Sequence, residues 1–114
     1  MDHQMGLYEE YYQQVINGNK IYEVRLNDGK RREIKVGDTI TFQIYPDSKA
    51  CLMVEVLELQ KYDTFEEMYR DLPFDLIGCK GWTMEDMLKG TYEIYSKEEE
   101  VKWGTVAIKM KVVA

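Results

Sequence analysis

The chain has 114 residues, of which 45% are hydrophobic and 32% are charged, and its formal net charge is −6. This length and composition are typical of one folded globular domain with its own hydrophobic core, and they exclude a disordered chain. The acidic balance also argues against indiscriminate nucleic-acid binding, which depends on an excess of cationic side chains.

The N-terminal part of the chain is expected to form a helix followed by a strand. We expect residues 1–5 to be a flexible lead-in, because a regular pattern begins only near Leu7. Apolar and aromatic residues then recur at helical spacing as far as residue 16, and Gly18 is suited to the end of a helix. Residues 20–26 alternate in a way that predicts a strand.

Residues 20–62 are expected to form three strands joined by turns. The sequence NDGK at 27–30 is a strong turn signal, and further strands are predicted at 39–45 and 50–62. Residues 20–35 carry a local charge balance of +3, whereas the rest of the chain has a balance of −9. The pattern therefore predicts a basic hairpin on an acidic body, which suits an anion site unless the charges have gathered on a turn by chance.

The C-terminal half is expected to contribute two helices and a last strand. Helices are predicted over 64–71 and 83–95, each after a threonine in capping-box spacing, although Gly90 weakens the second. Residues 96–100 are expected to be a charged turn, and residues 104–113 alternate as a strand. A strand after two helices must rejoin the earlier sheet to pair its backbone and bury its apolar face. The fold class predicted is therefore α+β, a small, strongly bent β-barrel with helices at its ends.

Residue types that bind metals or act as nucleophiles are scarce. The chain has one histidine, His3, and two cysteines, Cys51 and Cys79, which are too few for a zinc site, so we expect no metal and no cofactor. We expect Cys51 in the core, Cys79 in an exposed loop and no disulfide partner for either. No apolar run approaches the roughly 20 residues of a membrane span, and no signal-peptide pattern precedes Leu7. We therefore expect a cytoplasmic protein without a membrane partner, monomeric by default.

Lys20, Glu23 and Arg25 form the densest group of charges in an otherwise apolar stretch. Glu23 and Arg25 share one face of the predicted strand because side chains alternate, and Lys20 can join them from the turn after Gly18. A carboxylate beside the planar donor fork of arginine matches the polar edge of a base or a phosphate. The alternative is an ion pair that closes the end of the barrel, although a buried cluster of this kind is a costly way to build a core.

Two further groups are weaker candidates for a ligand site. Tyr22, beside these charges, and Trp82, in a predicted loop, are suited to stacking on a base, although most tyrosines at such spacings belong to a core. Arg31 and Arg32 on the predicted hairpin are suited to phosphate contact, or else they are solvated turn charges.

The sequence INGNKIYEVRL at 16–26 resembles the signature of the ASCH domain: glycine, any residue, lysine, two residues, glutamate, any residue, arginine. Gly18, Lys20, Glu23 and Arg25 match it position by position. The preceding helix, VGDTITF at 36–42 and WGTVAIKMKV at 103–112 are also similar to that family, so the resemblance covers nearly the whole chain as a stand-alone domain.

The resemblance implies a PUA-like β-barrel with a cleft into which the motif residues project, and RNA or a modified nucleoside as the ligand. One branch of the family hydrolyses N4-acetylcytidine with a lysine where Lys20 stands, a threonine where Glu23 stands and a downstream glutamate. Here Lys20 is retained and Glu23 replaces the threonine. The downstream glutamate has no counterpart around Lys80, and Glu85, a few residues later, is the nearest glutamate to that position.

Two functions follow as hypotheses. The favoured one is an RNA- or nucleotide-binding domain that holds its ligand through Gly18, Lys20, Glu23 and Arg25. The other is a metal-independent amidohydrolase acting on an acylated nucleoside such as N4-acetylcytidine, in which Lys20 stabilises the anionic intermediate and Glu23 activates water. The expected partner is RNA or a small nucleoside or nucleotide.

Overall fold

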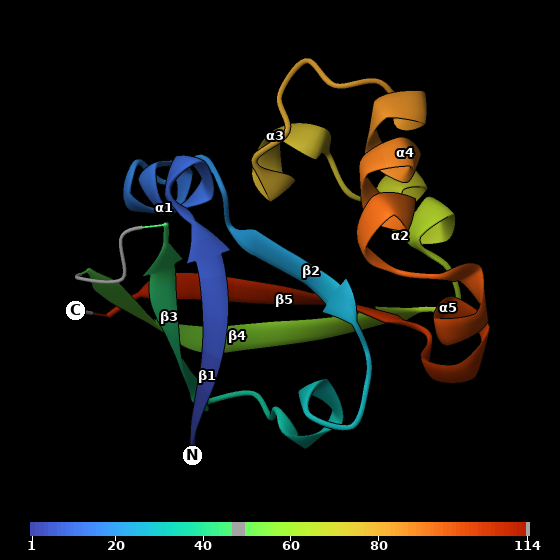
Figure 1. The fold of residues 1–114 in the computed structure, drawn as a ribbon. Coiled ribbons are helices and arrows are strands. Elements are labelled where there is room, and N and C mark those ends of the chain that lie inside the picture. Colours follow the sequence, from blue (N-terminus) through green and yellow to red (C-terminus); the bar gives the residue numbers. More distant parts are fainter. Residues whose placement is uncertain (47–49, 114) are drawn as a thin grey trace.

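The computed structural model describes residues 1–46 and 50–113, which form a curled five-stranded sheet with helices packed at its sides (Figure 1). The strands are β1 (Asp2–Tyr8), β2 (Tyr22–Leu26), β3 (Thr39–Tyr45), β4 (Cys51–Tyr62) and β5 (Thr105–Val112). The helices are α1 (Glu9–Ile16), α2 (Phe65–Asp71), α3 (Phe74–Ile77), α4 (Met84–Ile94) and α5 (Lys97–Trp103), and η1 (Arg31–Glu33) is a short 3-10 turn. The predicted α+β fold class is confirmed: one strongly bent sheet carries helices beside it.

The strand order in the sheet is β1-β3-β4-β5-β2, so β1 and β2 are its two edges. β1 pairs with β3 in parallel, and the other neighbours are antiparallel. The curl brings the two edges close enough that Arg25 of β2 donates from Nη2 to the carbonyl oxygen of Gly6 in β1, at 2.6 Å. A side chain therefore joins edges that no backbone ladder connects.

Two expectations about the first half of the chain were wrong. Residues 2–5 belong to β1, whose partner β3 lies 37 residues further on, from Asp2↔Thr39 to Tyr8↔Tyr45, so the local pattern carries no sign of the pairing. The helix consequently begins at Glu9. Residues 27–38 do not form a hairpin either, because β2 pairs with β5 while β3 lies between β1 and β4. The basic residues lie on a crossover between strands that are not neighbours.

The C-terminal elements follow local signals more closely. Thr83 and Asp86 form a full capping box at the start of α4, and α4 continues through Gly90. The expected charged turn at 96–100 is instead the start of α5, where Ser96 and Glu99 make a second capping box. Among the described residues, no helix is long and apolar enough to cross a membrane.

The hydrophobic core has two layers that share β5. Inside the curl, Val106 and Ile108 pack with side chains from β3 and β4, such as Phe42 and Val56. On the other face, Ala107 packs under the group formed by α2, α3 and α4. Because strand side chains alternate, β2 also contributes to the helical layer with Tyr22, Val24 and Leu26, while Glu23 and Arg25 face the other way.

Candidate functional site

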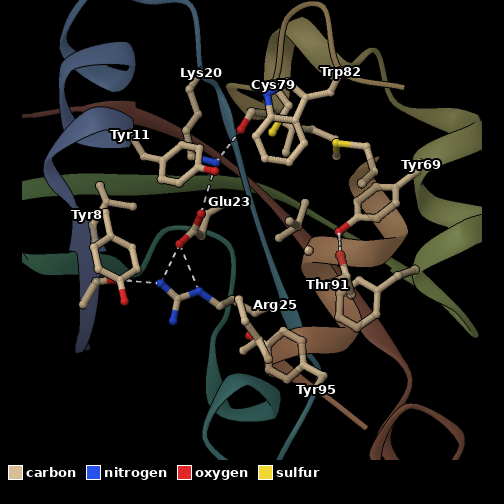
Figure 2. Close-up of a pocket in the computed structure, with 18 of the residues that line it drawn as sticks. Tyr8, Tyr11, Lys20, Glu23, Arg25, Tyr69, Cys79, Trp82, Thr91 and Tyr95 are labelled. Atoms are coloured by element: carbon tan, nitrogen blue, oxygen red, sulfur yellow. Dashed lines mark hydrogen bonds and ion pairs between the residues drawn. The ribbon is translucent and has the colours of Figure 1, made fainter. Parts of the chain in front are cut away.

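A pocket of about 490 Å³ lies over β2, between β1 and α1 on one side and the group α2, α3 and α4 on the other (Figure 2). Its volume is within the range of small-molecule sites in proteins. Most of the described lining is aromatic or aliphatic. Among residues 1–46 and 50–113, the charged residues that line the pocket are Lys20, Glu23 and Arg25, which we call the ion cluster.

Local structure brings Lys20 to the ion cluster. Gly18 adopts a φ of +80° directly after α1, a conformation that L side chains rarely adopt. The backbone amides of Asn19 and Lys20 then both donate to the carbonyl of Gln14, which turns the chain into β2. Lys20 thus precedes the regular strand and does not follow its alternation, as expected from the sequence.

The ion cluster is densely bonded. The ammonium of Lys20 donates to the carbonyls of Tyr22 and Ile77 at 2.7 and 2.8 Å, and it lies 3.1 Å from Oε1 of Glu23. Arg25 donates from Nε and Nη2 to Oε2 of Glu23 at 2.9 and 2.6 Å. Its remaining nitrogen, Nη1, has no hydrogen-bond partner among the residues that the structure describes. Among the described residues, the cluster therefore leaves one guanidinium nitrogen without an internal partner, while the three donors of Lys20 are already used.

Burial and charge act in opposite directions on Glu23. Burial alone would raise the pKa of Glu23, but the charges of Lys20 and Arg25 and their hydrogen bonds outweigh it and lower that pKa below its usual range. The carboxylate is therefore ionised at neutral pH and is a weaker base than an ordinary glutamate.

Aromatic side chains from separate elements form much of the pocket wall. Tyr11 of α1 lies beside the ammonium of Lys20, which is 5.4 Å from the centre of the tyrosine ring, and burial raises the pKa of Tyr11 to about 12. Trp82, in the loop before α4, is 43% exposed at the rim, where its indole lies against Gly90. Tyr69 of α2 and Tyr95, at the end of α4, line the wall opposite α1 (Figure 2).

Four of the residues predicted as site candidates line the pocket, namely Lys20, Glu23, Arg25 and Trp82. The other four do not: Gly18, Tyr22, Arg31 and Arg32. Gly18 shapes the turn before β2. Tyr22 is 8% exposed and packs in the helical layer, because it points to the opposite face from Glu23.

Arg31 and Arg32 are held by other parts of the chain. Arg31 pairs with Asp28 at 3.4 Å, and Arg32 donates to the backbone carbonyls of Asn27 and Trp103 and lies over the Trp103 ring. Their predicted place beside the pocket residues rested on a hairpin that does not form.

Sequence reasoning missed most of the pocket wall, including Tyr8, Tyr11, Tyr69 and Thr91. These residues come from β1, α1, α2 and α4, and no spacing in the sequence relates them. The two cysteines were also placed wrongly: Cys51 is exposed, and Cys79 is buried in the pocket wall, where burial raises the pKa of its thiol. Glu85 is exposed and does not line the pocket.

Comparison with known families identifies the domain, since the sequence model of the ASCH domain matches residues 5–114. The chain belongs to the ASCH family. None of the curated proteins matches this ASCH domain.

Solved structures agree with this assignment. The crystal structure of hypothetical protein PH0355 is 35% identical, with a TM-score of 0.88 over 99% of this chain and all of the other. The solution NMR structure of protein PF0455 from Pyrococcus furiosus is 33% identical, with a TM-score of 0.79 over 99% of this chain and 98% of the other. A mutant of the ASCH protein ZmASCH from Zymomonas mobilis, at 12% identity, has a TM-score of 0.62 over 96% of this chain and 68% of the other, which shows a shared fold.

Proposed function

We propose that this ASCH domain binds a base of RNA, or a nucleotide, in the pocket over β2. One observation carries the proposal: Arg25 is fixed on two sides by Glu23 and Gly6, yet its Nη1 edge has no partner among the described residues in a pocket with aromatic walls. The association of the ASCH family with RNA binding supports the same conclusion.

The chemistry of the pocket suits a planar ligand with a polar edge. Bases stack on aromatic rings, and the rings of Tyr11, Tyr95 and Trp82 line or border the cavity. A guanidinium held rigidly by a carboxylate loses little freedom when it donates to a base edge or a phosphate. Binding in this form uses the ion cluster without changing its internal bonds.

A purely structural role accounts for only part of the ion cluster. The hydrogen bond from Nη2 of Arg25 to the carbonyl of Gly6 joins the sheet edges. This agrees with the alternative in which the charges only close the end of the barrel. That bond explains neither why Nη1 lacks a partner among the described residues nor why Arg25 lines an aromatic pocket. A buried pair is also often no more stabilising than apolar residues of the same volume. We infer that the cluster both joins the edges and presents Arg25 to a ligand.

The geometry favours binding over hydrolysis. An amidohydrolase would need a free donor on Lys20 to stabilise an anionic intermediate and a basic Glu23 to activate water. The ammonium of Lys20 already has three acceptors, and the pKa of Glu23 is lowered.

Binding can be measured through the fluorescence of Trp82. The chain has two tryptophans, so a Trp103→Phe background leaves Trp82 alone. We expect saturable quenching by at least one of the four ribonucleoside 5′-monophosphates or by a five-nucleotide single-stranded RNA. Arg25→Gln is expected to weaken binding at least tenfold, because hydrogen bonds to charged groups contribute about 1.5–3 kcal/mol.

The matched control is Arg32→Gln, which removes the same charge outside the pocket and should leave the affinity within twofold. Thermal melts of both variants establish that they are folded. Failure of every ligand to quench Trp82, or equal weakening in the two variants, contradicts the proposal.

A separate incubation with N4-acetylcytidine, followed by chromatography, tests the hydrolase hypothesis. We expect no release of acetate. Release that is lost in Glu23→Gln would establish an amidohydrolase instead.

A further inference from the structure

The wall across the pocket from Lys20 and Glu23 contains a pair of hydroxyl groups (Figure 2). The phenol oxygen of Tyr69, in α2, lies 2.7 Å from Oγ1 of Thr91, in α4. Tyr69 is 5% exposed and Thr91 is 8% exposed, and both line the cavity. The lining of the pocket also includes the apolar side chains of Met87 and Phe65, and the ring centre of Phe65 lies 6.0 Å from that of Tyr69.

The pair has one hydrogen more than it uses. Each hydroxyl carries one hydrogen, and a single hydrogen bond between them uses one of the two. Whichever group donates, the accepting hydroxyl keeps a hydrogen of its own. Among residues 1–46 and 50–113, neither oxygen has a second hydrogen-bond partner. Burial raises the pKa of Tyr69 to about 12, so its hydroxyl remains protonated at neutral pH.

We propose that Tyr69 and Thr91 are the second polar anchor of the pocket and donate one hydrogen bond to an acceptor oxygen, of the carbonyl type, on a planar ligand. An unsatisfied buried donor costs about 1–3 kcal/mol, so a ligand that supplies the acceptor gains affinity over one that does not. The inference rests on the proposed function, since it concerns the same pocket, and it adds the functional group that the ligand must carry.

The two anchors recognise different features. Arg25 is a cation and favours any electron-rich edge, including a phosphate. The hydroxyl pair is neutral and lies in an apolar wall, so it favours a neutral acceptor over an anion, whose desolvation it cannot offset. Uracil, cytosine and guanine carry such an oxygen, and adenine does not. The hydroxyl pair therefore selects bases that carry a carbonyl oxygen.

The test uses the isosteric double variant Tyr69→Phe/Thr91→Val, because either single variant leaves one hydroxyl able to donate. The probes are uridine, 2-thiouridine and 4-thiouridine, in which sulfur, a weaker acceptor, replaces one carbonyl oxygen at a time. Affinity is read from the ¹³C methyl shift of Met87, a pocket residue that the variant keeps.

We expect the native protein to bind one of the two thio analogues fivefold to tenfold more weakly than uridine. The double variant should bind uridine more weakly by the same factor and should no longer distinguish that analogue from uridine. If the double variant binds uridine as the native protein does, or weakens all three probes equally, the inference is overturned. Its thermal melt should match that of the native protein, since replacing both partners of a hydrogen bond by apolar groups is nearly neutral.

A second probe pair separates failure of this inference from failure of the proposed function. If no nucleoside shifts Met87, and neither the four monophosphates nor the five-nucleotide RNA does so, the proposed function fails, and benzamide and toluene are then titrated at millimolar concentration. Benzamide carries a carbonyl and toluene does not. If the double variant binds benzamide more weakly than the native protein does but binds toluene equally well, the hydrogen bond from the hydroxyl pair is supported. Equal effects on the affinities of both probes, or no effect on that of benzamide, overturn the inference.

Discussion

The ion cluster and the basic segment at residues 30–35 are neighbours in the sequence, but the first is largely buried in the fold and the second is largely exposed. In the ion cluster, the side chains of Lys20 and Glu23 are 3% and 7% exposed, and each charge has a partner inside the pocket wall. In the basic segment, Lys30, Arg32 and Lys35 are exposed, on a crossover outside the pocket. A dense run of charge therefore does not by itself identify a site. Burial distinguishes the two regions, because a charge removed from water must be compensated.

The largest expected difference between the two regions concerns stability. Glu23→Gln removes the carboxylate that compensates the buried Lys20 and the partly buried Arg25, and we expect it to lower the free energy of unfolding by about 3 kcal/mol at pH 7. Glu33→Gln, in the exposed basic segment, should change it by no more than about 0.5 kcal/mol. Urea denaturation of both variants measures the contrast, and a loss below about 1 kcal/mol for Glu23→Gln would show that the cluster is not desolvated as described.

The second expected effect, intermediate in size, is on how the stabilities of the native protein and Glu23→Gln depend on pH. Because the pKa of Glu23 is lowered in the folded protein, its carboxylate contributes stability above its unfolded pKa of about 4.3. That contribution is lost as the pH falls through this value towards the folded pKa. The stability difference between native protein and Glu23→Gln should therefore be constant from pH 7 to pH 5 and shrink below pH 4. A difference that grows on acidification would contradict the assigned direction of the shift.

The smallest expected effect is on the salt dependence of RNA binding. If one guanidinium, that of Arg25, meets the nucleic acid, the affinity for a single strand should fall with a log–log slope of about −0.7, and Arg32→Gln should leave it unchanged. Titrations of the five-nucleotide RNA from 50 to 500 mM salt measure the slope. A slope of about −2 that becomes less steep in Arg32→Gln would show that the basic segment also contacts the RNA.

Several features of this domain depend on local rules and were predictable. Alternation on a strand places Glu23 and Arg25 on one face, and Gly18 after a helix allows Lys20 to join them. The capping box of Thr83 and Asp86 starts α4 where the sequence predicted it. The motif at 18–25 is therefore recognisable in the amino-acid sequence alone, and so is the family to which the chain belongs.

The rest depends on contacts between distant parts of the chain. β1 pairs with β3, a crossover places Arg31 and Arg32 outside the pocket, and Tyr69 contacts Thr91. Each of these features joins segments that are distant in the sequence, and the pattern of one segment does not predict its partner. Local spacing specifies which way a side chain points along its own element, but it does not specify which element lies opposite. Local rules therefore account for the charged face of the pocket. Its aromatic walls and the Tyr69–Thr91 pair depend instead on how the sheet curls and how the helices pack on it.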